Sequence, residues 1–337
     1  MISAFKRKLE FKLVTIWQSK QGLAKFLRPV SWLYCLVVVI RSLLYKLKIK
    51  KTEKVQTPVI VVGNITVGGT GKTPLVIWLC NYLKDNGYHP GIISRGYGGK
   101  ARSWPQQVRP DCDPVSVGDE AIMISSRTES PMAVGPERIV SAQKLLQYHP
   151  KCNVIISDDG LQHYALHRDI EVAVLNGTLR FGNGYCLPAG ALREPASRLN
   201  KVDFIVANGE AKDQEFAMRY KINYLCNLIY PDKIQPLDSL SGKEVHAVAG
   251  IGGPERFFNQ LAESGIKVIP HPFPDHFAFQ ESDLDFGDDK PVLMTEKDAV
   301  KCKRFGKDNH WYVPITVEVQ ESFGKAILTR LKELTNG

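Results

Sequence analysis

The sequence lacks the cysteine pattern of a zinc site or of a disulfide framework. Its seven cysteines are widely scattered and odd in number, and no C-x-x-C pair occurs. Internal repeats and low-complexity tracts are also missing. This cysteine usage fits a reducing cytoplasm best.

Acidic residues are scarce in the first sixty positions. Residues 1–60 hold thirteen Lys and Arg against only Glu10 and Glu53, although the whole chain carries a net charge of only +9. The chain is therefore a nearly neutral protein with a basic N-terminus. A basic arm of this kind is one way to bind nucleic acid, but this arm is also strongly apolar, so we expect no nucleic-acid partner.

The N-terminal segment has no apolar run long enough for a confident membrane span. Trp32–Ile40 is apolar throughout, and Arg41 then interrupts the pattern. As a helix, residues 30–45 would measure about 24 Å, against a hydrocarbon core of roughly 30 Å. Lysines follow in place of a cleavage site, and basic residues flank both ends. The pattern predicts a helix on an anionic membrane surface, facing the cytoplasm, with a buried core helix as the alternative.

The most informative stretch is a glycine-rich loop between an apolar run and a helix-like segment. The apolar run is 59–62, and the loop carries Gly68, Gly69 and Gly71 before Lys72-Thr73. Backbone N–H groups of such a loop bind nucleotide phosphates, the lysine adds positive charge, and the threonine hydroxyl can ligate Mg²⁺. The first glycine of G-x-x-x-x-G-K-[ST] falls at Thr66, so the loop is a variant. A glycine-rich turn without a ligand is the weaker alternative.

The pattern of elements predicts an α/β fold with two lobes. Alternating strands and helices across 58–205 predict a P-loop NTPase-like, mostly parallel sheet with helices on both faces. A change in composition near 227–237 indicates an extended linker, and a second, smaller α/β lobe follows. We expect a membrane-associating segment at 1–50, an ATP-binding domain at 51–228 and a C-terminal lobe at 229–337, with a cleft between the lobes. The expected elements of the first domain are strands at 59–62, 91–94, 153–157, 171–175 and 204–207, and helices at 74–85 and 138–148.

Several acidic residues are candidates for chemistry. Asp158 and Asp159 end an apolar strand, and such a strand next to a phosphate loop carries the acid that organises Mg²⁺. Asp119 and Glu120 precede a helix expected to start near 121, where they are equally well explained as caps or as a general base. Taken alone, His276 is more typical of a surface or packing histidine.

Three motif matches carry less weight. Asn200-Lys201-Val202-Asp203 spells a guanine-specificity motif but precedes a strand instead of ending one, so it is a coincidence. Gly250-Ile251-Gly252-Gly253 lacks the third glycine of a dinucleotide fingerprint. Thr295 with Asp298 is explained by a helix capping box.

Taken together, these stretches resemble the tetraacyldisaccharide 4'-kinase family, the lipid A 4'-kinases of Gram-negative bacteria. The matching pieces follow the family's order and span nearly the whole chain. They are Val62-Gly63-Asn64 through Thr73-Pro74, Ser94-Arg95-Gly96-Tyr97-Gly98, Gly118-Asp119-Glu120, Asp158-Asp159-Gly160-Leu161-Gln162-His163, Leu192-Arg193-Glu194-Pro195, Phe273-Pro274-Asp275-His276 and Thr295-Glu296-Lys297-Asp298-Ala299-Val300-Lys301.

The resemblance implies transfer of the ATP γ-phosphate to the 4'-hydroxyl of an acylated glucosamine disaccharide 1-phosphate at the cytoplasmic face of the inner membrane. Asp119 would be the general base and His276 its partner. Arg193 and Arg95 would face substrate or phosphate. ATP would be held by Thr66, Val67, Gly68, Gly69, Thr70, Gly71, Lys72 and Thr73, and Mg²⁺ by Thr73, Asp158, Asp159 and Glu194.

Two other functions compete with this one. A nucleotide-dependent switch ATPase acting through a protein partner uses similar loops, but usually with a lysine just before the glycine pair, where this chain has Val67. A soluble small-molecule kinase is the weaker option. No obligate protein partner is indicated.

Overall fold

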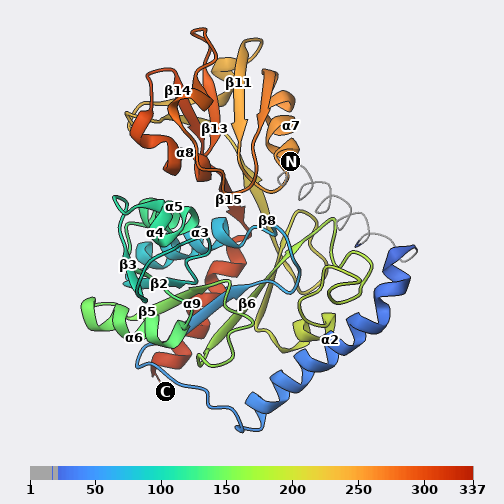
Figure 1. Cartoon of the computed structure of the whole chain (residues 1–337). Coiled ribbons are helices and arrows are strands. Elements are labelled where there is room, and N and C mark those ends of the chain that lie inside the picture. The colour runs from blue at the N-terminus through green and yellow to red at the C-terminus, as the bar shows by residue number, and fades with distance from the viewer. Residues whose placement is uncertain (1–16, 18–21, 337) are drawn as a thin grey trace.

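The chain forms two lobes, each built on its own β-sheet (Figure 1). The computed structural model describes residue 17 and residues 22–336. We call the nine-stranded sheet with its helices the large lobe and the six-stranded sheet with its helices the small lobe. The first part of the predicted 1–50 segment lies outside the described residues.

The large sheet is parallel at its centre and antiparallel at its two edges. Its strands, in sheet order, are β15 (Thr316–Val319), β8 (Phe216–Lys221), β7 (Phe204–Asn208), β6 (Ile170–Asn176), β1 (Val59–Gly63), β5 (Val154–Asp158), β2 (Pro90–Ser94), β4 (Met132–Val134) and β3 (Gln106–Val108). The predicted P-loop-type α/β fold is confirmed. The short strands β3 and β4 at one end of the sheet, and β8 and β15 at the other end, were not predicted.

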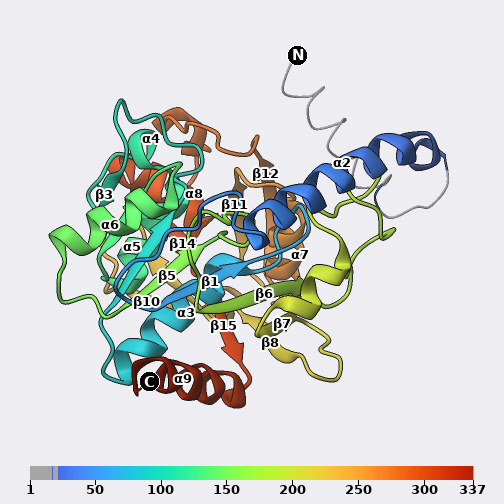
Figure 2. The same ribbon diagram turned by 90° about the horizontal axis from the view of Figure 1, so that it is seen from below.

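Helices cover both faces of the large sheet because its central strands are apolar on both sides. In β1, Ile60 and Val62 point into one core while Val59 and Val61 point into the other, and all four are buried. On the first face lie α3 (Lys72–Asp85), α5 (Asp119–Thr128) and α9 (Glu321–Asn336); the short α4 (Pro114–Val117) precedes α5. On the second face lies α6 (Arg138–Tyr148). Figure 2 shows α9 lying beside α3.

The small lobe has the same layered construction. Helix α7 (Glu255–Glu263) packs on one face of its sheet and α8 (Glu296–Cys302) on the other. Its strands, in sheet order, are β10 (Ile234–Pro236), β9 (Tyr224–Asn227), β14 (His310–Val313), β13 (Val292–Thr295), β11 (Glu244–Ala249) and β12 (Lys267–Pro272).

The chain passes between the lobes twice. It leaves the large sheet between β8 and β9 and returns between β14 and β15. The stretch Tyr230-Pro231-Asp232, interpreted from sequence as part of a linker, forms the turn of the β9–β10 hairpin. The division at 51–228 and 229–337 stays a prediction. From sheet membership we propose instead that 224–313 form the small lobe and that 316–336 belong with the large one.

Helix α2 (Leu23–Lys46) lies along the outside of the large lobe (Figure 1), and many of its large apolar side chains are exposed. Its 24 residues correspond to about 36 Å, so the predicted length was too short. The helix begins at Leu23 and continues through Pro29, whereas the predicted span began at residue 30. By length and composition alone, α2 is sufficient to cross a membrane.

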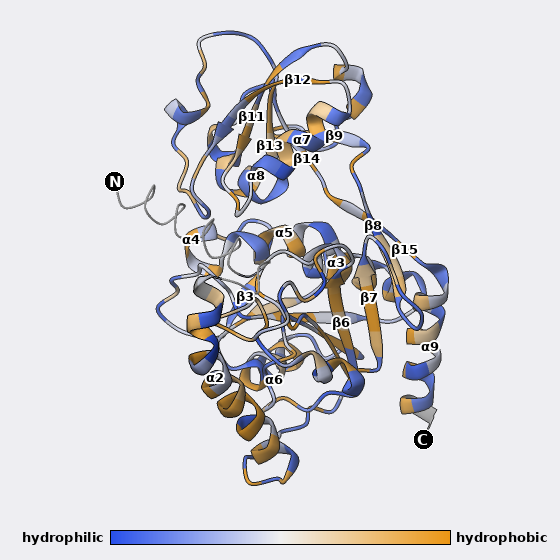
Figure 3. Cartoon of the chain, turned by 90° about the vertical axis from the view of Figure 1, so that its right-hand side faces the viewer, coloured by the Kyte–Doolittle hydropathy of each residue, from blue (hydrophilic) through white to orange (hydrophobic). Residues whose placement is uncertain are grey.

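Polar side chains of α2 contact the protein and its large apolar side chains face outward, which is the reverse of a helix in a soluble protein. Ser31 Oγ donates to the Cys186 carbonyl at 2.6 Å, and the Tyr34 hydroxyl donates to the Arg193 carbonyl at 3.1 Å. The large apolar side chains face away from the protein, with Trp32 64% and Leu33 63% exposed. Figure 3 shows that hydrophobic residues make up much of α2. The alternative of a buried core helix is therefore wrong.

Candidate active site

The glycine-rich loop connects β1 to α3 and is tightly held. Helix α3 starts at Lys72, two residues before the predicted start, because a proline in the first turn has no intrahelical hydrogen bond to lose. Asn64 Nδ2 donates to Thr70 Oγ1 at 3.2 Å. Gly71 has φ 101°, and a Cβ there would come within 2.9 Å of the Tyr220 hydroxyl. Only glycine fits at this position.

Lys72 and Arg193 meet at Asp159, at the carboxyl end of β5. Lys72 Nζ lies 3.5 Å from Asp159 Oδ1, and Arg193 Nη1 lies 3.1 Å from Asp159 Oδ2. Burial favours a higher pKa for Asp159, but the charges of Lys72 and Arg193 outweigh burial and lower the pKa. Asp159 is thus ionised at neutral pH. The structure brings these three predicted residues together.

Asp158 has a different environment from its neighbour. Burial and then the charge of Asp159 raise the pKa of Asp158 to about 6. Ser94 Oγ donates to its Oδ2 at 3.0 Å, while its Oδ1 is buried and has no hydrogen-bond partner among the described residues. Arg138, from α6, donates to the backbone carbonyl of Asp158 at 3.2 Å. A buried carboxylate oxygen without a donor is suited to a cation.

Glu194 is the second buried carboxylate with an unpaired oxygen. Its Oε2 accepts from the Tyr164 hydroxyl at 2.7 Å and lies 3.3 Å from Arg198 Nε. Its Oε1 has no partner among the described residues. No group of three His, Cys, Asp or Glu side chains within the described ranges is arranged to hold a metal ion. The donor set fits Mg²⁺, which needs only one or two carboxylates beside substrate phosphates and water.

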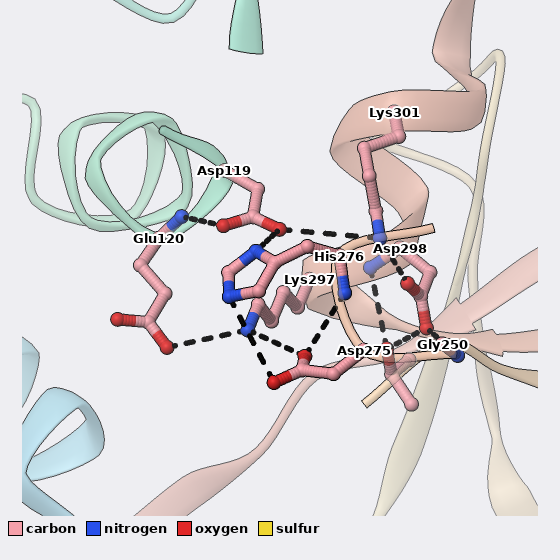
Figure 4. Close-up of polar contacts among 9 residues, drawn as sticks. Asp119, Glu120, Gly250, Asp275, His276, Lys297, Asp298 and Lys301 are labelled. Carbon is pink, nitrogen blue, oxygen red and sulfur yellow. Dashed lines mark hydrogen bonds and ion pairs between the residues drawn. The ribbon is translucent and has the colours of Figure 1, made fainter. Parts of the chain in front are cut away.

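Asp119 and His276 join the two lobes. His276 Nδ1 lies 3.1 Å from Asp119 Oδ2, although the residues are 157 positions apart (Figure 4). The hydrogen bond with Asp119 raises the pKa of His276, against the effect of burial. Burial favours a higher pKa for Asp119, but the hydrogen bond with His276 and the charge of Lys297 outweigh it and lower the pKa. The lowered pKa of Asp119 favours its ionised form, and the raised pKa of His276 means that its imidazole protonates more readily than usual.

Backbone strain marks the same residues. His276 has φ 57° and Asp159 has φ 46°, both in the left-handed region that side-chain-bearing residues rarely adopt. Strained residues of this kind cluster at functional sites, where the surrounding structure fixes them.

Lysines from α8 surround the Asp119–His276 pair. Lys297 Nζ lies 3.5 Å from Glu120 Oε1 and 3.3 Å from Asp275 Oδ1. Lys301 Nζ lies 3.9 Å from Asp119 Oδ2 and 2.6 Å from Asp298 Oδ1. Figure 4 shows Lys301 reaching from the small lobe toward Asp119, and Lys297 reaching toward Glu120 and Asp275. Two cations beside the pair favour the ionised form of Asp119.

Thr295 caps the start of α8 as predicted, but a bond from its hydroxyl to the Asp298 carboxylate at 2.6 Å replaces the reciprocal backbone bond of a capping box. Thr295 Oγ1 accepts from the backbone N–H of Asp298 at 3.2 Å. The Asp298 carboxylate is fully buried and also accepts from the backbone N–H of Gly250 at 2.8 Å. The cap thereby fixes the turn from which Lys297 and Lys301 project.

Arg95 is exposed at the carboxyl end of β2. The glycine-rich loop that follows it passes beside His276: the Tyr97 and His276 ring centroids are 5.3 Å apart. The charge of Arg95 acts on the pKa of Arg138, which burial lowers to about 10, so Arg138 stays protonated. Arg95 and Arg138 add positive charge at the edge of the sheet that carries Asp158.

Sequence reasoning missed Arg138, Lys297 and Lys301 as site residues. Arg138 begins α6 and is 3% exposed, and an arginine this buried is rare unless its charge is compensated. No signal in the sequence distinguishes it from a helix-start residue. For the two lysines the signal was present, because their spacing of four places both on one face of α8.

Comparisons with known proteins agree with this geometry. The family model for LpxK, tetraacyldisaccharide-1-P 4'-kinase, matches residues 23–332. The chain is 52% identical over 321 residues to the tetraacyldisaccharide 4'-kinase of Nitrosococcus oceani, covering 95% of this chain and 94% of that one. It is 50% identical over 319 residues to the tetraacyldisaccharide 4'-kinase of Methylobacillus flagellatus, covering 94% and 95%.

The fold is also that of a solved relative. The crystal structure of LpxK from Aquifex aeolicus, described as an "apo" form in complex with ATP, is similar at a TM-score of 0.78 and 29% sequence identity. The match covers 92% of this chain and 100% of that one. The site combines a phosphate loop, a carboxylate pair at a strand end and an Asp–His pair between two lobes. Together with these relatives, it shows that this chain belongs to the tetraacyldisaccharide-1-phosphate 4'-kinase family of enzymes.

Proposed function

We propose that the chain transfers the γ-phosphate of ATP to the 4'-hydroxyl of a tetraacylated glucosamine disaccharide 1-phosphate, a step of lipid A biosynthesis. The observation that carries the proposal is the Asp119–His276 pair, which is held between the lobes. Glu120, next to Asp119, is close enough to Asp158 for its charge to raise that residue's pKa, so the pair and the β5 carboxylates share one region. The relatives' names and the ATP complex of the Aquifex aeolicus protein support it.

ATP is held, in this proposal, by the loop from Thr66 to Thr73. The backbone N–H groups of the loop and the start of α3 face the phosphates. Lys72, with its side chain 14% exposed, reaches the β- and γ-phosphates, where its present ion pair with Asp159 gives way to a closer anion. Arg193 and Arg95 neutralise charge on phosphate or substrate.

Asp119 acts as the general base toward the 4'-hydroxyl. It takes the hydroxyl proton while His276 holds the carboxylate in place and stabilises its charge, or passes the proton on. Phosphoryl transfer depends mainly on positioning and charge neutralisation, so a base fixed by the closed lobes is well suited to it. Closure also excludes water and limits wasteful ATP hydrolysis.

Mg²⁺ fits the unpaired carboxylate oxygens of Asp158 and Glu194, together with Thr73 and Asp159. Bound there, it would neutralise charge developing on the transferred phosphate. Which of Asp158 and Asp159 ligates the metal directly stays a prediction.

The acceptor's acyl chains place the enzyme at a membrane. We propose that α2 rests at the anionic cytoplasmic face of the inner membrane, as a peripheral or monotopic anchor. Its outward apolar side chains and the lysines that follow it support this. We propose no obligate protein partner and no nucleic acid. The switch ATPase is not favoured, because it needs neither an acceptor base nor a lipid-facing helix.

The test is a phosphorylation assay in detergent micelles with ATP, Mg²⁺ and the disaccharide 1-phosphate lipid. We expect a Mg²⁺-dependent bisphosphorylated lipid, with its new phosphate at the 4'-position. Stoichiometric ATP hydrolysis without a phosphorylated lipid would refute the proposal and favour the switch.

A further inference from the structure

A cavity of about 420 Å³ lies between the last turn of α2 and the amino end of β6. Ser42, Tyr45 and Lys46 line it from α2, and Tyr164, Arg168 and Lys201 line it from the large lobe. No residue that the proposed mechanism uses lines the cavity.

The cavity has a surplus of positive charge. Its cationic side chains are Lys46, Arg168, Arg198 and Lys201, and its carboxylates are Glu171 and Asp203. Glu171 already forms ion pairs with both arginines: its Oε1 lies 3.0 Å from Arg168 Nη1 and 2.5 Å from Arg198 Nη2. Asp203 accepts from the backbone N–H of Glu171 at 2.8 Å. The acids of the cavity are thus occupied within the protein.

The remaining positive charge is available to a ligand. Lys46 and Lys201 are exposed and pair with no carboxylate in the part of the chain that the structure describes. Arg168 Nη2 is buried and has no hydrogen-bond partner in that part either. Tyr45 and Tyr164, with ring centroids 5.8 Å apart, form an aromatic wall. Lysine and arginine side chains beside hydroxyl groups recognise phosphate.

The exposed apolar side chains of α2 run along the helix whose last turns border this cavity. Leu36, Ile40 and Leu43 are between 47% and 55% exposed, and Leu47 follows at 59% just beyond the helix. Ser42 and Lys46 belong to the same last turns of the helix. An amphiphile lying along α2 would therefore have its acyl chains on the apolar side chains and its headgroup at the cavity.

We propose that this cavity binds the phosphate of an anionic membrane phospholipid, separate from the lipid that the enzyme phosphorylates. The proposal rests on the proposed membrane contact of α2 and not on phosphoryl transfer. A lipid bound here would fix the rotation of α2 about its axis, and hence the orientation of the active site above the membrane. Diffuse attraction by the basic segment would give no such orientation.

The test is binding of dihexanoylphosphatidylglycerol, below its micelle concentration, to the full-length protein, measured by calorimetry. We expect saturable binding that inorganic phosphate weakens only at much higher concentration. Ser42→Trp fills the cavity without a charge change and should abolish binding. Lys46→Gln with Lys201→Gln should weaken binding about tenfold or more. Lys243→Gln with Lys267→Gln makes the same charge change in the small lobe and should have no effect.

Several results would overturn the proposal. No saturable binding would do so, as would binding unchanged in Ser42→Trp, since that indicates diffuse electrostatics. Equal affinity for inorganic phosphate would assign the cavity to a free anion. A KM for the disaccharide lipid that rises in both Ser42→Trp and the cavity lysine variant would assign the cavity to the acceptor. Phosphatidylglycerol binding in a protein with no kinase activity would leave this inference standing while the proposed function failed.

Discussion

Arg127 of α5 and Glu296 of α8 face each other across the two lobes, with Arg127 Nη1 3.0 Å from each carboxylate oxygen of Glu296. Both side chains are mostly buried, at 23% and 11% exposed. Burial raises the pKa of Glu296 even though Arg127 opposes that shift. The pair lies on the helices that carry Asp119 and Lys301, so it connects the lobes next to the proposed base.

The first prediction concerns this pair. Arg127→Met or Glu296→Gln alone should lower kcat/KM, because each leaves one buried charge without its partner. The double variant should lose less than the two single losses added together, with a coupling of roughly 1–3 kcal/mol in a double-mutant cycle. Additive losses would mean that the pair does not hold the lobes together.

The second prediction concerns the base. Asp119→Asn should lower kcat by at least about 10²-fold without changing the KM for ATP. Glu120→Gln, the neighbouring acid on the same turn, serves as the control and should retain most of the activity. Turnover near that of the wild type in Asp119→Asn would return Asp119 to a capping role, since its Oδ1 already accepts from the Glu120 backbone N–H at 2.9 Å.

The third prediction is a pH profile. The pair accepts the hydroxyl proton when Asp119 is ionised and His276 is neutral. Because the hydrogen bond with Asp119 raises the pKa of His276 above its ordinary value of 6.5, kcat should increase as the pH passes through a value above 6.5. The lowered pKa of Asp119 keeps it ionised throughout this range. His276→Gln should remove that acidic limb; an unchanged limb would assign it to another group.

The fourth prediction separates stability from activity at Asp158. The pKa of Asp158 is about 6 in the folded protein, whereas the ordinary value for an aspartate is 3.8. Burial of the charged carboxylate therefore destabilises the fold above pH 6. The free energy of unfolding should fall by about 3 kcal/mol as the pH rises from 4 to 6. Without Mg²⁺ at pH 7.5, Asp158→Asn should therefore raise the melting temperature.

The same variant should bind Mg²⁺ at least about tenfold more weakly and be nearly inactive. Asp159→Asn is the matched comparison. It loses ion pairs with Lys72 and Arg193, so its melting temperature should fall. If both variants melt alike, the difference in environment between the two carboxylates has no energetic consequence.

The fifth prediction concerns the membrane. Leu36→Glu with Ile40→Glu places charge on the outward side of α2, and we expect the protein to move from the membrane to the soluble fraction on cell fractionation. Tyr148→Glu, at a side chain 61% exposed on α6, is the control and should stay with the membrane. Full retention of the α2 variant would contradict the proposed anchor.

Much of the large lobe was predictable because its signals are local. The apolar runs of β1, β5, β6 and β7 are continuous, and glycines with Lys72 mark the loop. Strand β4 has only three residues, Met132–Val134, and β15 joins its sheet from the far end of the chain, so neither has a local signature.

The residues of the candidate site were predictable one by one, but spacing alone does not encode their arrangement. The pairing of Asp119 with His276 depends on how two lobes close, and only the family resemblance implied it. The contrast between Asp158 and Asp159 likewise comes from burial on one side and Lys72 with Arg193 on the other. The length of α2 was underestimated because the predicted span, 30–45, omitted its first turns from Leu23 to Pro29.

The return of β15 and α9 to the large sheet has a consequence for biosynthesis. Phe323, Ile327 and Leu331 are fully buried in the core that α3 also lines, and they follow the small lobe in the sequence. The nucleotide-binding lobe, although it is encoded first, therefore cannot complete its core until the small lobe has been made. During translation all strands of the small lobe are therefore synthesised before the large sheet is complete, and the edge of β8 stays uncovered until β15 has been made.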